Sequence, residues 1–275
     1  MTFSDALSLA FTPQLWTLLI ICAILCAIGF YKFVYFLSIG YGFAISGVGV
    51  SLILMFSGRL SPGCLVQCLL FILYGIRLSG FLVVREIRSI SYRETLENTT
   101  QTEKPIPFFV KFCIWISVSI LYVAQTSPVY YRLSNGLEQG VVPWIGASVM
   151  TAALILETIS DIQKSAAKKQ NPHRFCDTGL YKLVRCPNYL GEILFWTGVF
   201  LSGFGAFKGI VQWTVAILGY ITILYVMFSG AKRLEQRQNK NYGSNEEYQA
   251  YISKTPLLIP FIPLYSLSRW SFIKV

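Results

Sequence analysis

Seven apolar runs, each close to the length that crosses a lipid bilayer, constrain this chain more than any other feature. A helix needs about 20 residues to cross the hydrocarbon, and lipid offers the backbone no hydrogen bonds, so such runs form helices or barrel strands. Their length, without strict alternation of polar and apolar residues, favours helices. We therefore expect an all-α, polytopic membrane protein with about seven transmembrane helices. The runs lie near Leu15–Phe30, Phe33–Phe56, Gly63–Val84, Phe108–Val129, Val141–Ile159, Tyr189–Phe207 and Val211–Phe228.

The composition agrees with a membrane protein. Only 13% of the 275 residues are charged and 54% are hydrophobic, whereas about a quarter of a soluble domain is charged. The spans use most of the length, so we expect one membrane-embedded domain over residues 1–275. The stretch before the first run lacks the basic residues of a secretory signal, and we expect that run to be retained. The seven cysteines are odd in number and lie mostly in apolar segments, which predicts packed thiols, with neither disulfides nor a metal site.

The basic residues predict the orientation. With seven spans and the C-terminus in the cytoplasm, the N-terminus lies outside, and the outer segments then carry only Arg59, Arg132 and Lys208. This distribution follows the positive-inside rule. It accounts for most of the net charge of +10 without nucleic acid as a partner, although a basic inner face also suits a phosphate-bearing ligand. The sequon at Asn98 falls on the inner side.

Several ionisable groups lie within or beside the spans, where they are expensive and often functional. Tyr74 and Arg77 are three residues apart on nearly one helix face. A phenol beside a guanidinium can donate a proton to a developing oxyanion, but Tyr74 can equally be a packing residue, and Arg77 can extend to the interface. Glu157 and Asp161, four residues apart, either end a helix beside basic neighbours or accept hydrogen bonds from a ribose or an amide.

The segment RCPNYLGE, from Arg185 to Glu192, carries polar groups to the start of the sixth run. Pro187 suits the first turn of a helix, whose amides and dipole favour anions. Asn188 and Glu192 are four residues apart and share a face, and a carboxylate one turn into a span needs a partner. The residues Asp177-Thr178-Gly179 before it predict a turn. His173, the single histidine, receives no role.

The block GLYKLVRCPNYLGE, with SDIQK before it and NYGSNEEYQAYISKTPLLIPFIP after it, resembles the membrane steroid 5-alpha-reductase family, especially its bacterial branch. The specific signature covers about 157–263, and a weaker correspondence of spans extends it to about 63–263. The resemblance implies helices that enclose a pocket for NADPH. It implies a reductase that transfers hydride to a carbon–carbon double bond conjugated to a ketone, in a 3-oxo-4-ene steroid or a similar lipophilic substrate.

The resemblance also implies roles for individual residues. Tyr74 matches the tyrosine that polarises the substrate ketone. Cys186 stands where many bacterial relatives have histidine, and we find no early Gln-Glu pair, so the partner of Tyr74 at the ketone stays open. The residues that match cofactor contacts are Arg77, Arg88, Asp161, Lys168, Arg174, Asn188, Glu192 and Arg233.

Two other classes of protein share parts of this pattern. A membrane methyltransferase of the isoprenylcysteine carboxyl type has a similar Gly-Leu-Tyr block and tail, and would use S-adenosylmethionine. Asn188 and Glu192 favour the reductase over it. A lipid-binding membrane protein without catalysis would bind no nucleotide tightly.

Overall fold

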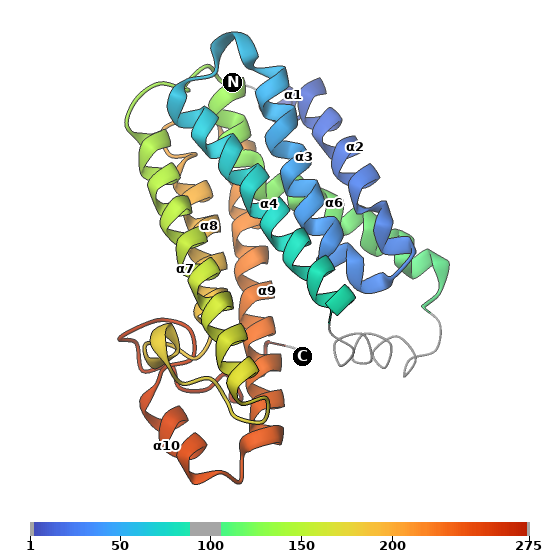
Figure 1. Ribbon diagram of the computed structural model, residues 1–275. Helices are drawn as coiled ribbons and strands as arrows, with labels where there is room; N and C mark the ends of the chain where they lie inside the picture. The colour runs from blue at the N-terminus through green and yellow to red at the C-terminus, as the bar shows by residue number, and fades with distance from the viewer. Residues whose placement is uncertain (1–2, 89–105, 274–275) are drawn as a thin grey trace. The chain divides into compact units, whose positions relative to one another are not determined.

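The computed structural model describes residues 3–88 and 106–273 (Figure 1). The structure is 77% helix, and the described residues contain no strand, which confirms the all-α prediction. Six of its helical segments are long and apolar enough to cross a membrane, so the chain is a polytopic membrane protein. These segments are Pro13–Phe30, Phe33–Met55, Pro62–Ile87, Phe108–Ser134, Val142–Gln170 and Ile210–Tyr242.

The remaining predicted span, Tyr189–Phe207, forms the shorter helix α8 (Pro187–Leu201). At 1.5 Å per residue α8 is about 22 Å long, less than the ~30 Å of a typical hydrocarbon core. A turn over residues 202–206 ends it earlier than the apolar run suggests. Its start at Pro187 is as predicted, since proline has no N–H to leave unsatisfied there. The orientation of the termini depends on whether α8 crosses, so the N-out arrangement stays a prediction.

Thiol labelling tests that orientation. Asn98 lies outside the described residues, and a cysteine there should react with an impermeant maleimide only from the cytoplasmic side, because this basic segment is expected inside. The parent is Cys113→Ser, since Cys113 is the exposed native cysteine and the other six are free and buried. Ser57→Cys, in a predicted outer turn, is the matched control and should react from outside. Reaction of Asn98→Cys from outside would contradict the topology.

The described residues form two compact units, which we describe separately; the prediction of one domain over the whole chain is not tested by this division. The first unit comprises residues 1–147 and 199–220. It contains the beginning of α7 (Val142–Gln170), the last residues of α8 and the beginning of α9 (Ile210–Tyr242). Its other elements are α1 (Phe3–Ala10), α2 (Pro13–Cys26), η1 (Ala27–Phe30), η2 (Phe33–Leu37), α3 (Ile39–Met55), η3 (Ser57–Arg59), α4 (Pro62–Arg88) and α6 (Phe108–Ser134).

Helices α3 and α4 pack backbone to backbone in the first unit. A Cβ at Gly75 would lie 2.0 Å from the carbonyl oxygen of Gly42, so only glycine permits this approach. The hydroxyl of Ser79 donates to the carbonyl of Ile39 at 2.9 Å across the same contact. Small residues with such hydrogen bonds are how membrane helices associate without a hydrophobic driving force. The contact fixes the helix that carries Tyr74 and Arg77.

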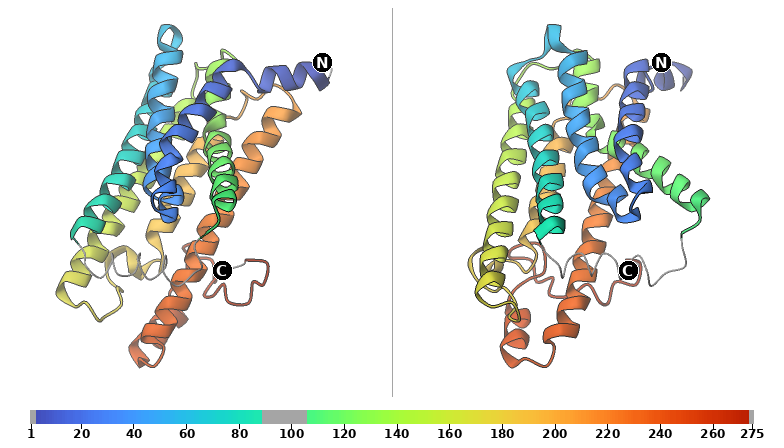
Figure 2. Two further views of the ribbon diagram at one scale, coloured as in Figure 1. Left: turned by 90° about the vertical axis from the view of Figure 1, so that its right-hand side faces the viewer. Right: turned by 45° about the vertical axis from the view of Figure 1, so that its right-hand side comes forward.

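The second unit comprises residues 148–198 and 221–275. It contains most of α7 and α8, the helix η4 (Gly179–Lys182), the later part of α9, α10 (Glu246–Lys254) and the segment after α10. After α10 the chain turns back beside α9 (Figure 2). Its core joins Cys186, Ala231 and Leu234 to four side chains of that last segment, namely Leu257, Leu258, Leu267 and Ile273.

Candidate functional site

Two buried carboxylates lie in the second unit on α7 and α8. Glu157 packs against Gly191: a Cβ at that glycine would lie 3.0 Å from Cβ and Cγ of Glu157. Glu192, the next residue, accepts a hydrogen bond from Nε1 of Trp196 at 3.2 Å, and both glutamates take part in further interactions. Buried charges are tolerated only with such partners. The sequence predicts that Glu192 needs a partner, and Trp196 of the same helix is one such partner.

Where the sequence predicts a turn at residues 177–179, the structure has a bend at Thr178 that leads into the 3-10 helix η4. Gly179 has φ of +60°, a left-handed conformation that glycine adopts without strain. The next residue, Leu180, donates its N–H to Oε1 of Gln163 on α7 at 2.8 Å. Tyr251 of α10 donates its hydroxyl to the carbonyl of Tyr181 at 2.7 Å. The Gly-Leu-Tyr block is thus tied to α7 on one side and to α10 on the other.

Arg185 is buried and holds the segment after α10. Its guanidinium donates to the carbonyl of Tyr265 and lies 3.5 Å from the carboxylate of Glu235 on α9. Its own N–H donates to the carbonyl of Pro256 at 2.9 Å, and the N–H of Cys186 donates to that of Leu257 at 3.0 Å. Glu235 also accepts the N–H of Leu267 at 3.0 Å. The first residues of RCPNYLGE are therefore fixed by a buried ion pair and two backbone bonds.

Asn188, the second residue of α8, has an amide oxygen that is buried and has no hydrogen-bond partner among the described residues. Buried acceptors of this kind are rare in native structures. Tyr189 follows it and packs on Gly230 of α9, where a Cβ would lie 2.8 Å from its ring. The start of α8 thus combines an unsatisfied acceptor with a phenol ring packed against α9.

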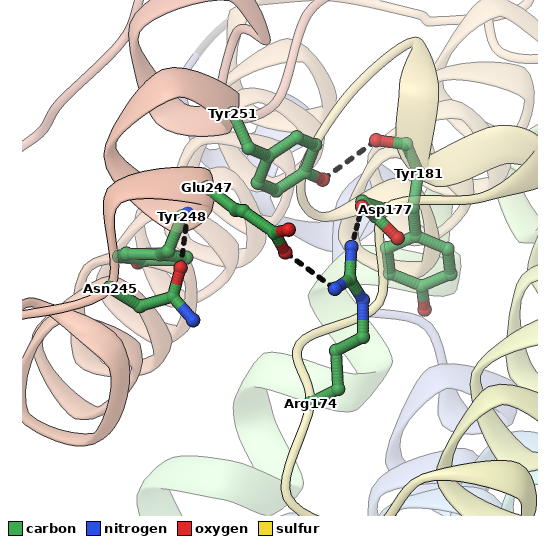
Figure 3. A network of polar contacts seen from close by, with 7 residues as sticks. All are labelled: Arg174, Asp177, Tyr181, Asn245, Glu247, Tyr248 and Tyr251. Atoms are coloured by element: carbon green, nitrogen blue, oxygen red, sulfur yellow. Dashed lines mark hydrogen bonds and ion pairs between the residues drawn. The ribbon is translucent and has the colours of Figure 1, made fainter.

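Two predicted cofactor contacts, Lys168 in the last turn of α7 and Arg174 in the loop after it, lie close together and bind other groups of the protein. Arg174 contacts Glu247 at 2.6 Å and Asp177 at 3.0 Å, and Figure 3 shows its guanidinium between the two carboxylates. These hydrogen bonds, first that to Asp177, raise the pKa of Arg174 above its usual value. The Nζ of Lys168 donates to the carbonyl of Arg174 at 2.7 Å and to the Tyr242 hydroxyl at 2.8 Å. The ion pairs of Arg174 with Glu247 and Asp177 are at least partly solvent-exposed and therefore contribute little stability.

Phe175 gives the same loop an apolar attachment to α10. Its buried ring stacks on Tyr251, with centroids 5.4 Å apart, and meets Tyr248 edge to face at 5.2 Å. Asn245 caps α10 by accepting the N–H of Tyr248 at 3.1 Å, and the acidic Glu246 and Glu247 occupy its first turn. Aromatic packing therefore joins the loop to α10, while the ion pairs of Arg174 lie on the surface of the protein.

The other predicted site residues fall in both units. In the first unit Tyr74 is fully buried, edge to face with Tyr41 at a centroid distance of 5.8 Å, and Arg77 is half-buried on the same helix. Arg88 is the last residue of α4. In the second unit Asp161 is half-buried on α7, and Arg233 is exposed on α9. The convergence of these residues on one site stays a prediction.

Sequence reasoning missed the roles of two buried residues in the second unit. Arg185 received no role of its own within the segment RCPNYLGE, and Glu235 received none. The available signal was Glu235 itself, an acidic residue among Lys232, Arg233 and Arg237 just after an apolar run. A single carboxylate in a basic segment beside the membrane is a reason to look for a cation that it pairs with.

Comparison with known proteins gives a family. The profile of the family described as "Protein of unknown function (DUF1295)" matches residues 23–255, most of the chain, and this family is related to steroid 5-alpha-reductase-like membrane proteins. An uncharacterized protein of Schizosaccharomyces pombe is 26% identical over 190 residues, which cover 61% of this chain. That match covers 53% of the yeast protein, about half of its length. No solved structure matches.

Proposed function

This chain belongs to the DUF1295 family of membrane proteins, and from that premise we propose that it is an NADPH-dependent membrane reductase. Its substrate class is a lipophilic molecule with a carbon–carbon double bond conjugated to a ketone, such as a 3-oxo-4-ene steroid. The proposal draws on the resemblance to the steroid 5-alpha-reductase family over about 157–263. It draws equally on the chemistry of the residues at the start of α8.

The observation that carries the proposal is the unsatisfied amide oxygen of Asn188. A buried acceptor without a donor costs about 1–3 kcal/mol, and it is explained if a ligand supplies the donor. The carboxamide of nicotinamide has an N–H₂ group of the required kind. The residues present therefore fit the nicotinamide end of NADPH, with Asn188 as its acceptor.

The phosphates of the cofactor need cations. The residues proposed for them from the family resemblance are Arg77, Arg88, Lys168, Arg174 and Arg233. Guanidinium groups bind phosphate oxygens by charge-assisted hydrogen bonds, often in pairs. Arg174 would have to exchange Glu247 or Asp177 for a phosphate, which its exposure permits.

The chemistry assigned to the protein is proton donation. NADPH, when bound, supplies the hydride that adds to the β-carbon of the enone. The electron pair of the double bond then develops as negative charge at the ketone oxygen. Tyr74 is the residue proposed to donate its phenolic proton there and stabilise that charge.

A binding screen separates this proposal from its rivals. Thermal unfolding of the purified full-length protein is followed with NADPH, NADH and S-adenosylmethionine. A ligand that binds only the folded state raises the melting temperature by mass action. Stabilisation by NADPH is the expected result. Stabilisation by S-adenosylmethionine alone indicates a methyltransferase, and no shift with any nucleotide indicates a lipid-binding protein without catalysis.

Asn188→Ala and Arg77→Ala should both weaken NADPH binding. Loss of one neutral hydrogen bond lowers affinity about 2- to 10-fold, and loss of a charge-assisted phosphate contact about 10- to 150-fold. Titration of NADPH against intrinsic fluorescence measures both. Gln236→Ala and Arg59→Ala, at exposed positions, are the matched controls and should leave the affinity unchanged. An unaltered affinity in either test variant removes that residue from the site.

A further inference from the structure

The segment after α10 has one side buried against the protein and one side of exposed aromatic and aliphatic residues. Leu257, Leu258, Leu267 and Ile273 face the core of the second unit. We call the exposed side the outer face of the tail; it comprises Phe261, Ile262, Tyr265 and Phe272. Phe261 is 97% exposed and Phe272 is 67% exposed. Two phenylalanines so exposed on a short segment indicate an apolar partner.

The exposed position of Phe261 is built into the backbone. It lies between Pro260 and Pro263 and has φ of +65°, the single non-glycine positive φ among the described residues. The N–H of Leu257 donates to the carbonyl of Leu264 at 2.8 Å and closes the loop that carries it. A bulky residue in this conformation is strained, and such strain accompanies function more often than chance allows. The loop therefore holds the Phe261 ring away from the core.

Contacts with α9 give the level of the tail relative to the membrane. From Ile210 to Ala231 this helix carries no charged residue, a length of about 33 Å that is close to the ~30 Å of the hydrocarbon core. Phe228, within one turn of the end of this stretch, thus lies near the edge of the hydrocarbon. Trp270 stacks on it with centroids 6.0 Å apart and planes 7° apart. Residues 270–273 are therefore at the level where aromatic residues form interfacial belts.

Lys232 fixes the end of the tail at that level. This lysine is one turn beyond Phe228, and its buried Nζ donates to the carbonyls of Trp270 and Ile273, both at 2.9 Å. Phe272 lies between these two residues and stacks on Trp270 at 5.4 Å, with much of its ring exposed. Arg269, three residues earlier in the chain, is exposed and cationic. An exposed aromatic ring and a cation on one short segment at the hydrocarbon edge suit a surface with anionic lipid headgroups.

We propose that the tail is an interfacial membrane anchor, with Phe261 and Phe272 inserted among the headgroups and upper acyl chains of the lipid. The bilayer is its partner, independently of the reductase activity. Because the N–H groups of Arg185 and Cys186 bond to Pro256 and Leu257, the anchor attaches directly to the residues that precede Asn188. The lipid surface thereby positions the start of α8.

Fluorescence quenching in vesicles of phosphatidylcholine and phosphatidylglycerol tests this anchor. Full-length Cys113→Ser protein carries a thiol-linked fluorophore at Phe272→Cys, at Phe261→Cys or at Ser253→Cys; Ser253 is exposed on the polar helix α10 and is the control. Lipid spin-labelled near the headgroup should quench the probes at 272 and 261 strongly, while aqueous iodide quenches them little. At residue 253 iodide should quench the probe strongly and the spin-labelled lipid should quench it little. Each variant is used only if its melting temperature equals that of the Cys113→Ser parent.

The quenching pattern distinguishes three environments of the outer face of the tail: lipid, water and a second copy of the protein. Iodide quenching at 272 and 261 as strong as at 253 shows that the outer face lies in water and overturns the proposal. Protection from both quenchers that disappears at low protein-to-lipid ratio shows that a second copy covers the face, which also overturns it. Two probes are used so that damage from one substitution does not decide the result.

Discussion

Replacing Tyr74 with phenylalanine should lower the turnover of NADPH-dependent enone reduction by about 10²–10³-fold, the usual cost of removing one donor to an oxyanion. The ring remains, so its edge-to-face contact with Tyr41 and its packing in α4 should survive. The hydroxyl acts on charge that develops in the transition state, and NADPH affinity should therefore stay near that of the parent. The measurement is NADPH oxidation, followed by absorbance, with a 3-keto-4-ene steroid or another enone lipid found by screening.

Tyr122→Phe is the matched control for this experiment. Tyr122 belongs to the same aromatic group, with its ring centroid 4.7 Å from that of Tyr41, and its hydroxyl donates to the carbonyl of Phe36 at 2.7 Å. Its loss should lower stability and leave turnover per folded molecule unchanged. Near-parental turnover of Tyr74→Phe, with the weakened NADPH affinity expected for Asn188→Ala, makes Tyr74 a packing residue. Normal turnover of Tyr74→Phe together with unaltered NADPH affinity of Asn188→Ala contradicts the reductase proposal.

The helices were predictable because membrane helices follow local rules. Lipid forces apolar runs into helices regardless of their tertiary partners, and prolines such as Pro62 and Pro187 mark where α4 and α8 begin. The failure at α8 is also local. The apolar run continues to Phe207, but glycines at 203 and 205 allow a turn. Hydrophobicity alone therefore does not show where the helix ends.

The site was only partly predictable because it depends on distant pairings. The sequence identifies Asn188 and Glu192 by their spacing, and the structure adds that Asn188 keeps an unsatisfied acceptor. Nothing local in the sequence shows that Glu247 engages Arg174, since these residues meet only when α10 folds back. The tail is the extreme case. Residues 255–273 have no regular pattern, and their position follows from contacts with Arg185, Lys232 and Glu235.

Arg185→Met should destabilise the folded protein by about 3–5 kcal/mol, because it leaves the carboxylate of Glu235 buried without its cation. The side chain also loses its hydrogen bond to the carbonyl of Tyr265, so the tail loses part of its attachment. Thermal and denaturant unfolding in detergent, followed by tryptophan fluorescence, measure the change. Arg237→Met, an exposed arginine on α9, is the matched control and should change the free energy of unfolding by less than about 0.5 kcal/mol.

A second variant tests whether the charge, and not the lost packing, causes the effect. Arg185→Met combined with Glu235→Gln removes both charges, and the glutamine oxygen can still accept the N–H of Leu267. The double variant should therefore recover much of the stability lost in Arg185→Met, since replacing a whole buried ion pair costs far less than removing one partner. If the single and double variants are equally unstable, the cost comes from packing. If Arg185→Met is no less stable than Arg237→Met, the ion pair does not hold the tail. The tail would then be held beside α9 by Lys232, by the stack of Trp270 on Phe228 and by its buried side chains alone.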